Sequence, residues 1–418
     1  MYTILYMLVG EIELGLVCLS VLIWLGLLCF RGQFWRTDQR LPEGETTPQP
    51  TSLGVYPSVC AVVPARNEAD VLPISLRSLL TQDYPGAFSV ILVDDQSTDG
   101  TAKIAQQVAQ DLNQKSQLHI IAGVPLPTGW TGKLWAMEQG IRHAQSLTPL
   151  PDYLLFTDAD IEHEGGNLRR LTAKAQQDDL DLVSLMVLLR CESFWEQLLI
   201  PAFVFFFQKL YPFRWVNDST KATAAAAGGC ILIRRDALTQ IGGIQTVRQA
   251  LIDDCALAQA VKSSRGTGED ACSPEKQLKG RIWLGLTSST RSLRPYPSLA
   301  SIWKMVARTA YTQLNYSPLL LLGTVIGMSL IYLVSPISAI LGGLTGQWLI
   351  AIAGLSGWLL MALAYLPILR FYRCSPGLAL SLPAIAFLYT LMTLDSALRH
   401  WQGRGGAWKG RVYSETTS

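Results

Sequence analysis

The distribution of apolar residues is the feature that most constrains how this chain of 418 residues folds. A run of 17 residues without a charge extends from Leu14 to Phe30, which is about the shortest helix that crosses the hydrocarbon core of a bilayer. Three more apolar stretches come late, at about Pro318–Leu341, Trp348–Leu369 and Gly377–Leu394. We therefore expect an integral membrane protein, with residues 1–36 as an N-terminal transmembrane anchor.

Charged residues beside the first run predict its direction. Glu11 and Glu13 precede it, and Arg31 and Arg36 follow it, so the positive-inside rule places the N-terminus outside and the following domain in the cytoplasm. A cleaved signal peptide is the alternative, although no lysine or arginine precedes the run and no A-x-A cleavage site follows it.

The late stretches leave the side of the C-terminus open. Pro383 interrupts the third stretch, and a basic tail follows at 399–418. If all three stretches cross the membrane, this tail ends outside, against the charge rule. We therefore expect the C-terminal membrane region, 311–398, to hold two or three spans, and with two spans the third stretch is re-entrant or interfacial. The helix expected near 194–210 is aromatic and interrupted by polar residues, which favours the membrane interface over a buried core position.

Between the membrane segments the composition is that of a soluble domain. Residues 37–56 are rich in Pro, Thr, Gly and Glu and are expected to be a linker to a cytoplasmic domain at 57–310. The net charge is +2 and the sequence contains no RNA- or DNA-binding motif, so no nucleic-acid partner is expected. The eight cysteines include no C-x-x-C pair, which predicts reduced thiols rather than a disulfide framework or a zinc site.

The middle domain alternates β-prone and helical segments. Five short apolar runs predict strands, at 58–64, 88–93, 119–122, 153–157 and 180–189. Strands that alternate with helices predict an α/β fold, with a mostly parallel sheet and helices on both faces. Such sheets bind their ligands beyond the carboxyl ends of the strands.

Acidic and amide side chains follow several of these predicted strands. Asp158-Ala159-Asp160 ends the fourth run, and a carboxylate pair with this spacing suits Mg²⁺ or Mn²⁺, which share their ligand shell with substrate phosphates. A solvated turn also explains a D-x-D motif that stands alone. The metal-site interpretation of this pair is strengthened because Asp94-Asp95 and Arg66-Asn67-Glu68 follow two other predicted strands.

Several motifs together resemble a known family. The chain contains, in this order, V-V-P-A-R-N-E, V-D-D-Q-S-T-D-G-T, G-K-L-W-A, T-D-A-D and I-D-D-C-A-L. Over roughly residues 57–310 they resemble glycosyltransferase family 2, the large inverting family that contains cellulose, chitin and ceramide glucosyl transferases. The segments A-A-A-A-G-G-C-I-L-I-R-R, M-V-A-R-T-A-Y-T-Q-L and W-K-G-R-V-Y are more closely similar to the hopene-associated glycosyltransferases of bacteria, with ceramide and carotenoid glycosyltransferases as more distant relatives.

This resemblance implies a fold, a donor and a metal. The fold is the GT-A nucleotide-diphosphosugar fold, a mixed, mostly parallel sheet with helices on both faces. Asp94 and Asp95 match the acidic residues that hold the uracil and ribose of the donor, and Asp160 matches the ligand of a Mg²⁺ or Mn²⁺ ion. Lys133 is a natural phosphate partner, with a solvated surface lysine as the alternative. The donor-binding residues implied are Pro64, Arg66, Asn67, Glu68, Asp94, Asp95, Lys133 and Asp158.

The catalytic residues implied are Asp254 and Arg308. The family normally has Glu-Asp where this chain has Asp253-Asp254, and the second carboxylate is the general base that deprotonates the acceptor hydroxyl. Two aspartates at a predicted helix start also fit a plain helix cap. Relatives carry Q/R-x-x-R-W, of which Arg308 remains to clamp the leaving diphosphate, while Thr309 replaces the tryptophan. The loss of this tryptophan favours the transfer of one sugar to a small acceptor over the processive synthesis of a polysaccharide.

Three further features have open interpretations. Trp408, Lys409 and Arg411 suit a diphosphate or a lipid headgroup as accessory residues, or are a plain basic tail at the membrane surface. Gly228-Gly229-Cys230 allows close backbone approach, either as a wall of the acceptor site or as ordinary packing. The polar segment Ser263–Gln277 is expected to be a surface loop.

The function expected is that of an inverting, metal-dependent glycosyltransferase in the inner membrane of a bacterium, with its catalytic domain in the cytoplasm. It moves one sugar from a nucleotide-diphosphate sugar to a lipid acceptor, a hopanoid, a sphingolipid-like lipid or another isoprenoid alcohol. The alternatives are a polyprenyl-phosphate glycosyltransferase, a polysaccharide synthase, a transporter and a catalytically inactive scaffold.

Overall fold

The computed structural model describes residues 2–42, 48–50, 55–264, 280–404, 407–408 and 411–412. Contacts divide the chain into two units, which we describe separately. The helical unit comprises Met1–Asp38, Cys191–Pro212 and Tyr296–Gly406. The sheet unit comprises Gln39–Arg190, Phe213–Pro295 and Ala407–Ser418. The helix near 194–210, expected within the 57–310 domain, therefore groups by its contacts with the helical unit.

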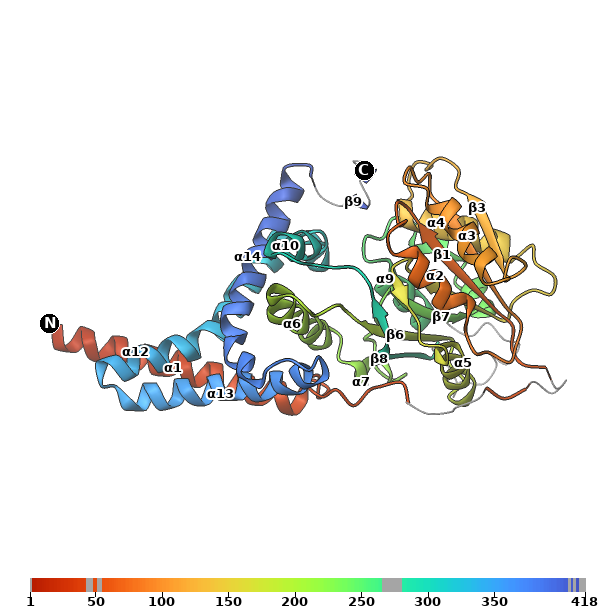
Figure 1. The fold of residues 1–418 in the computed structure, drawn as a ribbon. Helices are drawn as coiled ribbons and strands as arrows, with labels where there is room; N and C mark the ends of the chain where they lie inside the picture. The colour runs from red at the N-terminus through yellow and green to blue at the C-terminus, as the bar shows by residue number, and fades with distance from the viewer. Residues whose placement is uncertain are drawn as a thin grey trace. The chain divides into compact units, whose positions relative to one another are not determined.

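The sheet unit is built on an eight-stranded sheet in the order β3-β2-β1-β4-β7-β6-β8-β5 (Figure 1). Its strands are β1 (Val59–Ala65), β2 (Phe88–Asp94), β3 (Leu118–Ala122), β4 (Tyr153–Thr157), β5 (Ile161–Glu162), β6 (Leu182–Leu188), β7 (Cys230–Arg234) and β8 (Ile282–Ser292). The five predicted strands correspond to β1 to β4 and β6, with ends that agree within two residues. Sequence analysis missed β5, β7 and β8.

The expected mixed, mostly parallel sheet is confirmed. Strands β3, β2, β1 and β4 are parallel to one another, and their carboxyl ends therefore meet at one edge of the sheet. Strand β7 runs antiparallel to both β4 and β6, while β8 is parallel to β6 and antiparallel to β5. All seven residues of β1 are buried, which explains why its sequence is an unbroken apolar run.

Helices cover both faces of this sheet. Side chains alternate along β1, so that Val59, Ala61 and Val63 pack on one face against α2 (Leu72–Leu80), α3 (Thr101–Asp111) and α5 (Asn167–Gln177). On the other face α4 (Gly132–Ala144) approaches so closely that a Cβ atom at Gly140 would lie 2.4 Å from Val62. The remaining helical segments of this unit are α7 (Phe213–Val216), α8 (Arg235–Gln240), η1 (Ile244–Val247) and α9 (Asp253–Ser263).

The helical unit contains the apolar segments. Its elements are α1 (Tyr2–Phe30), α6 (Phe194–Leu210), α10 (Leu299–Ala307), η2 (Thr312–Leu314), α11 (Pro318–Met328), η3 (Ser329–Leu333), α12 (Val334–Thr345), α13 (Trp348–Phe371), η4 (Pro376–Ser381) and α14 (Leu382–Trp401). In the described part of the chain, four helical segments are long and apolar enough to cross a membrane, namely Gly10–Phe30, Pro318–Thr345, Trp348–Phe371 and Pro376–Trp401. They include the predicted N-terminal run and all three late stretches.

These four segments are not equivalent in their packing. Helices α1, α12 and α13 run alongside one another and make contact pairwise, whereas α14 crosses their direction (Figure 1). Helix α14 packs on α10, α6 and α11. Trp24 in α1 donates a hydrogen bond to the carbonyl of Ile331, at 2.8 Å, where η3 interrupts the regular helix between α11 and α12.

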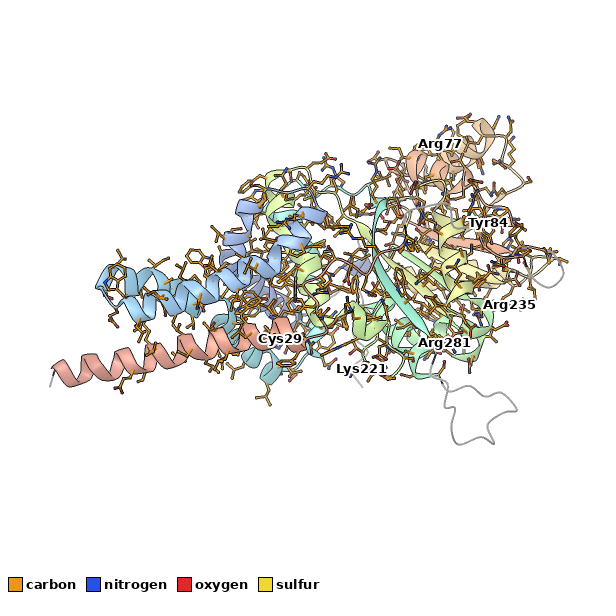
Figure 2. The ribbon with its side chains drawn as sticks, turned by 90° about the horizontal axis from the view of Figure 1, so that it is seen from below. Cys29, Arg77, Tyr84, Lys221, Arg235 and Arg281 are labelled. Atoms are coloured by element: carbon orange, nitrogen blue, oxygen red, sulfur yellow. The ribbon has the colours of Figure 1, made fainter. Side chains whose placement is uncertain are left out.

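Helix α6 is a packed helix of the helical unit. It begins with a capping box between Ser193 and Glu196, and it packs against α13 and α14. Leu199, Ile200 and Phe205 are fully buried, while Phe194 is exposed at its start. The core-helix alternative therefore describes its packing, and its position in a membrane interface stays a prediction. The seven cysteines in the described part are free thiols, with Cys29 exposed near the end of α1 (Figure 2).

Candidate active site

The loops after β1 and β2 bind to each other at the carboxyl edge of the sheet. The backbone N–H of Asn67 donates to the Ser97 hydroxyl at 3.0 Å, and the Asn67 side chain accepts from the N–H of Thr98 at 2.8 Å. The N–H of Glu68 donates to Thr101 at 3.0 Å. Asn67 has φ 51°, a left-handed conformation that asparagine tolerates better than most residues. The R-N-E and D-D-Q-S-T-D-G-T motifs therefore form one structure.

Arg66 and Asp95 are the charged pair inside this structure. The Arg66 Nη1 atom donates to the Asp95 carbonyl at 2.6 Å and lies 3.5 Å from its carboxylate, which is fully buried. Asp94 accepts a hydrogen bond from the N–H of Ser97 at 3.0 Å and so shapes the turn. Pro64, in β1, is buried and lines a small cavity described below. The predicted donor-binding residues from the first two strands thus lie together.

Lys133 joins two predicted acidic motifs. It lies in the first turn of α4, and its Nζ atom is 2.9 Å from Asp158 and 3.3 Å from Asp253. Burial lowers the pKa of the Lys133 ammonium, but the carboxylates of Asp158 and Asp253 more than offset this and raise it. Lys133 is therefore a charged group between the end of β4 and the start of α9, and not a solvated surface lysine.

Asp254 follows Asp253 in the sequence, and two backbone N–H donors hold its carboxylate. Its carboxylate accepts from the N–H of Gly228 at 2.8 Å and from the N–H of Cys255 at 2.7 Å. Burial, followed by the charge of Asp253, raises the pKa of the Asp254 carboxyl to about 6, while Lys133 and the two N–H donors oppose the shift. A carboxylate with a pKa near the working pH is suited to accept a proton.

Gly228 lies close to both Lys133 and Asp254. A Cβ atom there would lie 3.2 Å from the Lys133 Nζ atom and 3.4 Å from the Asp254 carboxylate. The glycine thus lets the backbone approach both charged side chains, and the strand β7 that follows it holds this backbone in the sheet. A cavity opens at this place, lined by Pro64, Lys133, Leu134, Met137, Phe156, Thr157, Asp158, Gly228, Ile231, Ile244, Asp253, Asp254 and Leu257.

The Asp160 carboxylate pairs with Arg294, a residue that the sequence analysis did not identify. The Arg294 Nε atom lies 2.6 Å from the Asp160 carboxylate, and its Nη2 atom lies 3.0 Å from the carboxylate of Glu68. Arg294 follows β8, a strand that the sequence analysis did not recognise. The sequence marks Arg294 only as an arginine before a proline, just after an eleven-residue β-prone segment.

A buried polar network of Thr157, His163 and Asn167 holds the end of β4 in place. The Thr157 hydroxyl donates to the carbonyl of Gly229 at 2.8 Å and lies 2.9 Å from the His163 Nε2 atom. The other ring nitrogen of His163 is 3.0 Å from the Asn167 side-chain amide. Burial lowers the pKa of His163 to about 3, so the ring is neutral. The network ties Asp158 and the Gly228-Gly229 backbone to one frame, and sequence analysis did not identify it.

The residues at the end of β4 fit the divalent ion that the resemblance implies. Burial raises the pKa of the Asp160 carboxyl, and the nearby negative charge of Asp158 raises it further, while Arg294 opposes the shift. In the described ranges no group of three or more His, Cys, Asp or Glu could hold a metal by itself. Mg²⁺ and Mn²⁺ commonly take one or two carboxylates and complete their shell with water and substrate phosphates, so the donor set fits.

The remaining predicted site residues are Arg308, Trp408, Lys409 and Arg411. Arg308 caps the end of α10 in the helical unit, and its role at the leaving diphosphate stays a prediction. Trp408 and Arg411 lie in the two-residue strands β9 (Ala407–Trp408) and β10 (Arg411–Val412), which pair with each other. Lys409 lies outside the described residues, as does most of the predicted loop Ser263–Gln277.

Known proteins are similar to this chain in sequence and in fold. Residues 60–242 match the sequence model of the family described as "Glycosyl transferase family 2". A 4,4'-diaponeurosporenoate glycosyltransferase of Staphylococcus haemolyticus is 30% identical over 137 residues, which are 33% of this chain and 31% of that protein. A beta-monoglucosyldiacylglycerol synthase of Synechocystis sp. is 34% identical over 117 residues, which are 28% of this chain and 22% of that protein. The chain thus spans less than a third of the length of either relative.

One solved structure is similar over nearly its whole length. A mannosyltransferase from Pyrobaculum calidifontis, in complex with GDP-Man and Mn²⁺, has a TM-score of 0.53 to this chain at 18% identity. The match covers 93% of this chain and 99% of that chain. At this level of identity the likeness shows the fold, which is the GT-A fold.

Proposed function

Because residues 60–242 match the sequence model of glycosyl transferase family 2, we propose that this protein is an inverting glycosyltransferase that moves one sugar from a nucleotide-diphosphate sugar to a membrane lipid. The observation that carries the proposal is the group Lys133, Asp158, Asp253 and Asp254 beside one cavity. It puts a cation suited to a phosphate next to a carboxylate whose pKa is raised to about 6.

In the proposed reaction Asp254 is the general base. The acceptor hydroxyl oxygen attacks the anomeric carbon, the bond from that carbon to the diphosphate oxygen breaks, and the hydroxyl proton passes to the Asp254 carboxylate. One displacement on the face opposite the leaving group inverts the anomeric configuration. The N–H groups of Gly228 and Cys255 fix the carboxylate so that little reorganisation accompanies the transfer.

Charge on the donor side is divided among several groups. Lys133 is proposed to bind a donor phosphate, and the support is that it keeps its proton and has an ammonium group that pairs with anionic oxygens, here two carboxylates within 3.3 Å. Asp160, with Asp158 beside it, would hold a Mg²⁺ or Mn²⁺ ion, which when bound neutralises the diphosphate. Arg66, Asn67, Glu68, Asp94 and Asp95 form the nucleotide side of the site, and Arg308 is proposed as a further cation for the leaving group.

The acceptor is proposed to be a lipid alcohol. Two observations support a lipid, namely the apolar helices of the helical unit and the names of two relatives, one acting on diaponeurosporenoate and one making a glucosyldiacylglycerol. A hopanoid, a sphingolipid-like lipid or another isoprenoid alcohol all provide a hydroxyl at the membrane surface. A polyprenyl phosphate is the second candidate, since a Salmonella undecaprenyl-phosphate 4-deoxy-4-formamido-L-arabinose transferase is 28% identical over 121 residues.

We also propose a topology for the inner membrane of a bacterium. Helix α1, the segment Pro318–Thr345 and helix α13 cross the bilayer, and α14 lies across them near the cytoplasmic surface. The support is that α1, α12 and α13 pack alongside one another while α14 crosses their direction (Figure 1). This topology keeps the sheet unit and the basic tail in the cytoplasm and obeys the positive-inside rule.

The test is direct product analysis. Membranes that contain the protein are incubated with a panel of labelled UDP- and GDP-sugars, and the lipid extract is analysed by mass. We expect one sugar added to one lipid class, dependent on Mg²⁺ or Mn²⁺. Transfer to a growing polysaccharide, or no transfer to lipid with any donor while a related enzyme labels the same membranes, would contradict the proposal.

A further inference from the structure

We propose that Arg294 is a built-in cation of the donor site, which holds the Asp160 carboxylate when no divalent metal is present and competes with the metal for it. This inference rests on the proposed function only in taking Asp160 as the metal ligand. It assigns a role to a residue outside every motif that carried the family resemblance.

The contacts of Arg294 define the role. Its Nε atom is 2.6 Å from Asp160, and its Nη2 atom is 3.0 Å from Glu68, so one guanidinium bridges two carboxylates from the loops after β4 and β1. The backbone reinforces the bridge, because the N–H of Leu293 donates to the Asp160 carbonyl at 2.8 Å. A planar guanidinium is the side chain best suited to such a fork, since it presents several donors in fixed directions.

Burial makes a cation at this place necessary. The exposed fractions of the Asp160 and Glu68 side chains are only 9% and 11%. A buried carboxylate is costly unless a cation and hydrogen bonds offset the loss of water. Arg294 supplies both in the structure, and a divalent ion on Asp160 would supply the same charge. The two cations therefore serve the same carboxylate.

Arg294 and a metal ion on Asp160 also repel each other. Two cations that share a carboxylate only about 3 Å away lie close enough for a strong unfavourable interaction. Binding of one must therefore weaken binding of the other, by the same factor in both directions. Arg294 is the more exposed partner, since 36% of its side chain is exposed against 9% for Asp160, and it lies beyond the end of β8.

Glu68 determines what happens to Arg294 after displacement. The Nη2 contact to Glu68 does not use Asp160, so the guanidinium remains anchored when it leaves Asp160. It then stays beside the donor site as a positive charge. The arrangement offsets part of the carboxylate charge without metal and makes the site more cationic when the metal arrives with the negatively charged diphosphate.

The test measures metal binding without turnover. The full-length protein in detergent is titrated with Mn²⁺ alone, and free Mn²⁺ is followed by electron paramagnetic resonance. Arg294→Gln removes the competitor and should tighten Mn²⁺ binding by about fivefold or more, within the range of ordinary coupling between two sites. Arg294→Lys keeps a charge but not the fork and should fall between. Asp160→Asn should abolish this binding in both the parent and the Arg294→Gln protein.

Arg291→Gln is the matched control. Arg291 lies in β8, three residues before Arg294, and its exposed side chain pairs with Glu162 at 2.6 Å instead of with Asp160. Its variant should bind Mn²⁺ like the parent. Melting curves add an independent readout, since Arg294→Gln should melt lower than the parent in EDTA and regain the difference in Mn²⁺.

The outcomes separate this inference from the proposed function. Unchanged or weaker Mn²⁺ binding in Arg294→Gln overturns the competition, and so does binding that survives Asp160→Asn or an absence of binding in every variant. Sugar transfer to lipid by the parent protein would remain valid in each of these cases. Conversely, tighter binding in Arg294→Gln from a protein that transfers no sugar would support Arg294 and contradict only the glycosyltransferase.

Discussion

At the scale of single residues, the proposed chemistry depends on the charges that surround Asp254. Asp253 is its neighbour along the chain, and Lys133 is near enough to affect its proton affinity. Burial and Asp253 raise the Asp254 pKa to about 6, and Lys133 opposes them. Since only the deprotonated carboxylate can accept a proton, we expect kcat/KM to fall about tenfold for each pH unit below about 6.

Substitution of the two neighbours should move this acidic limb in opposite directions. Asp253→Asn removes a negative charge that raises the Asp254 pKa, so the limb should move to lower pH. Lys133→Gln removes a positive charge that lowers it, so the limb should move to higher pH, whatever its separate effect on donor affinity. Complete pH profiles of kcat/KM measure both shifts. Shifts in the same direction, or none, would show that Asp254 does not limit the reaction in acid.

At the scale of elements, the close approach of α4 to the sheet positions Lys133. A Cβ atom at Gly140 would lie 2.4 Å from Val62 and 3.1 Å from Val93, so the helix rests directly on β1 and β2. Lys133 lies seven positions earlier, at the other end of the same helix. Displacement of the helix would therefore move the Lys133 ammonium from Asp158.

We expect Gly140→Val to destabilise the sheet unit and to slow transfer. Overpacking of this kind costs about 1–3 kcal/mol, which for a protein of this size lowers the melting temperature by about 2 °C or more. The control is Gly165→Val, because a Cβ atom at Gly165 meets nothing within 4 Å. Equal melting temperatures for the two variants would mean that α4 can shift without cost.

The local sequence pattern was sufficient to predict the buried strands, but not the strand or the contacts that depend on tertiary packing. The buried runs of β1, β2 and β4 are apolar on both faces, and each ends at a polar motif, so strand and site residues were both recognisable. Strand β8 was missed because its second half, from Thr287 to Ser292, is polar, and Arg294 was missed with it. The bridge from Arg294 to Asp160 joins residues 134 positions apart, which no local pattern encodes. The His163 network is likewise a product of tertiary packing.

At the scale of the whole molecule, membrane topology decides whether the donor and the lipid can meet. Four segments are long and apolar enough to cross, but α14 does not run with α1, α12 and α13. Three crossings place the N-terminus outside and the tail in the cytoplasm, whereas four crossings place both ends outside.

A reporter at the C-terminus distinguishes these topologies. A green fluorescent protein fused after residue 418 should fluoresce in intact cells, and alkaline phosphatase fused there should be inactive. The same reporters after residue 345, between the second and third crossings, should give the opposite pair of results. An active phosphatase at the C-terminus would mean that α14 crosses the bilayer and that the charge rule fails in this protein.

The central claim is that Asp254 removes the acceptor proton while other residues bind the donor. Asp254→Asn should therefore retain donor affinity within about threefold while the rate of a single turnover falls by about a hundredfold or more, the usual contribution of a general base. Asp236→Asn is the control, because the Asp236 side chain is 76% exposed and pairs with Arg235, a residue at the surface of the sheet unit (Figure 2). The most direct measurement is the single-turnover rate of sugar transfer to lipid in Asp254→Asn, at saturating donor and pH 7.5. We expect a rate near zero with the donor still bound, whereas a rate close to that of the Asp236→Asn control would show that Asp254 is not the general base.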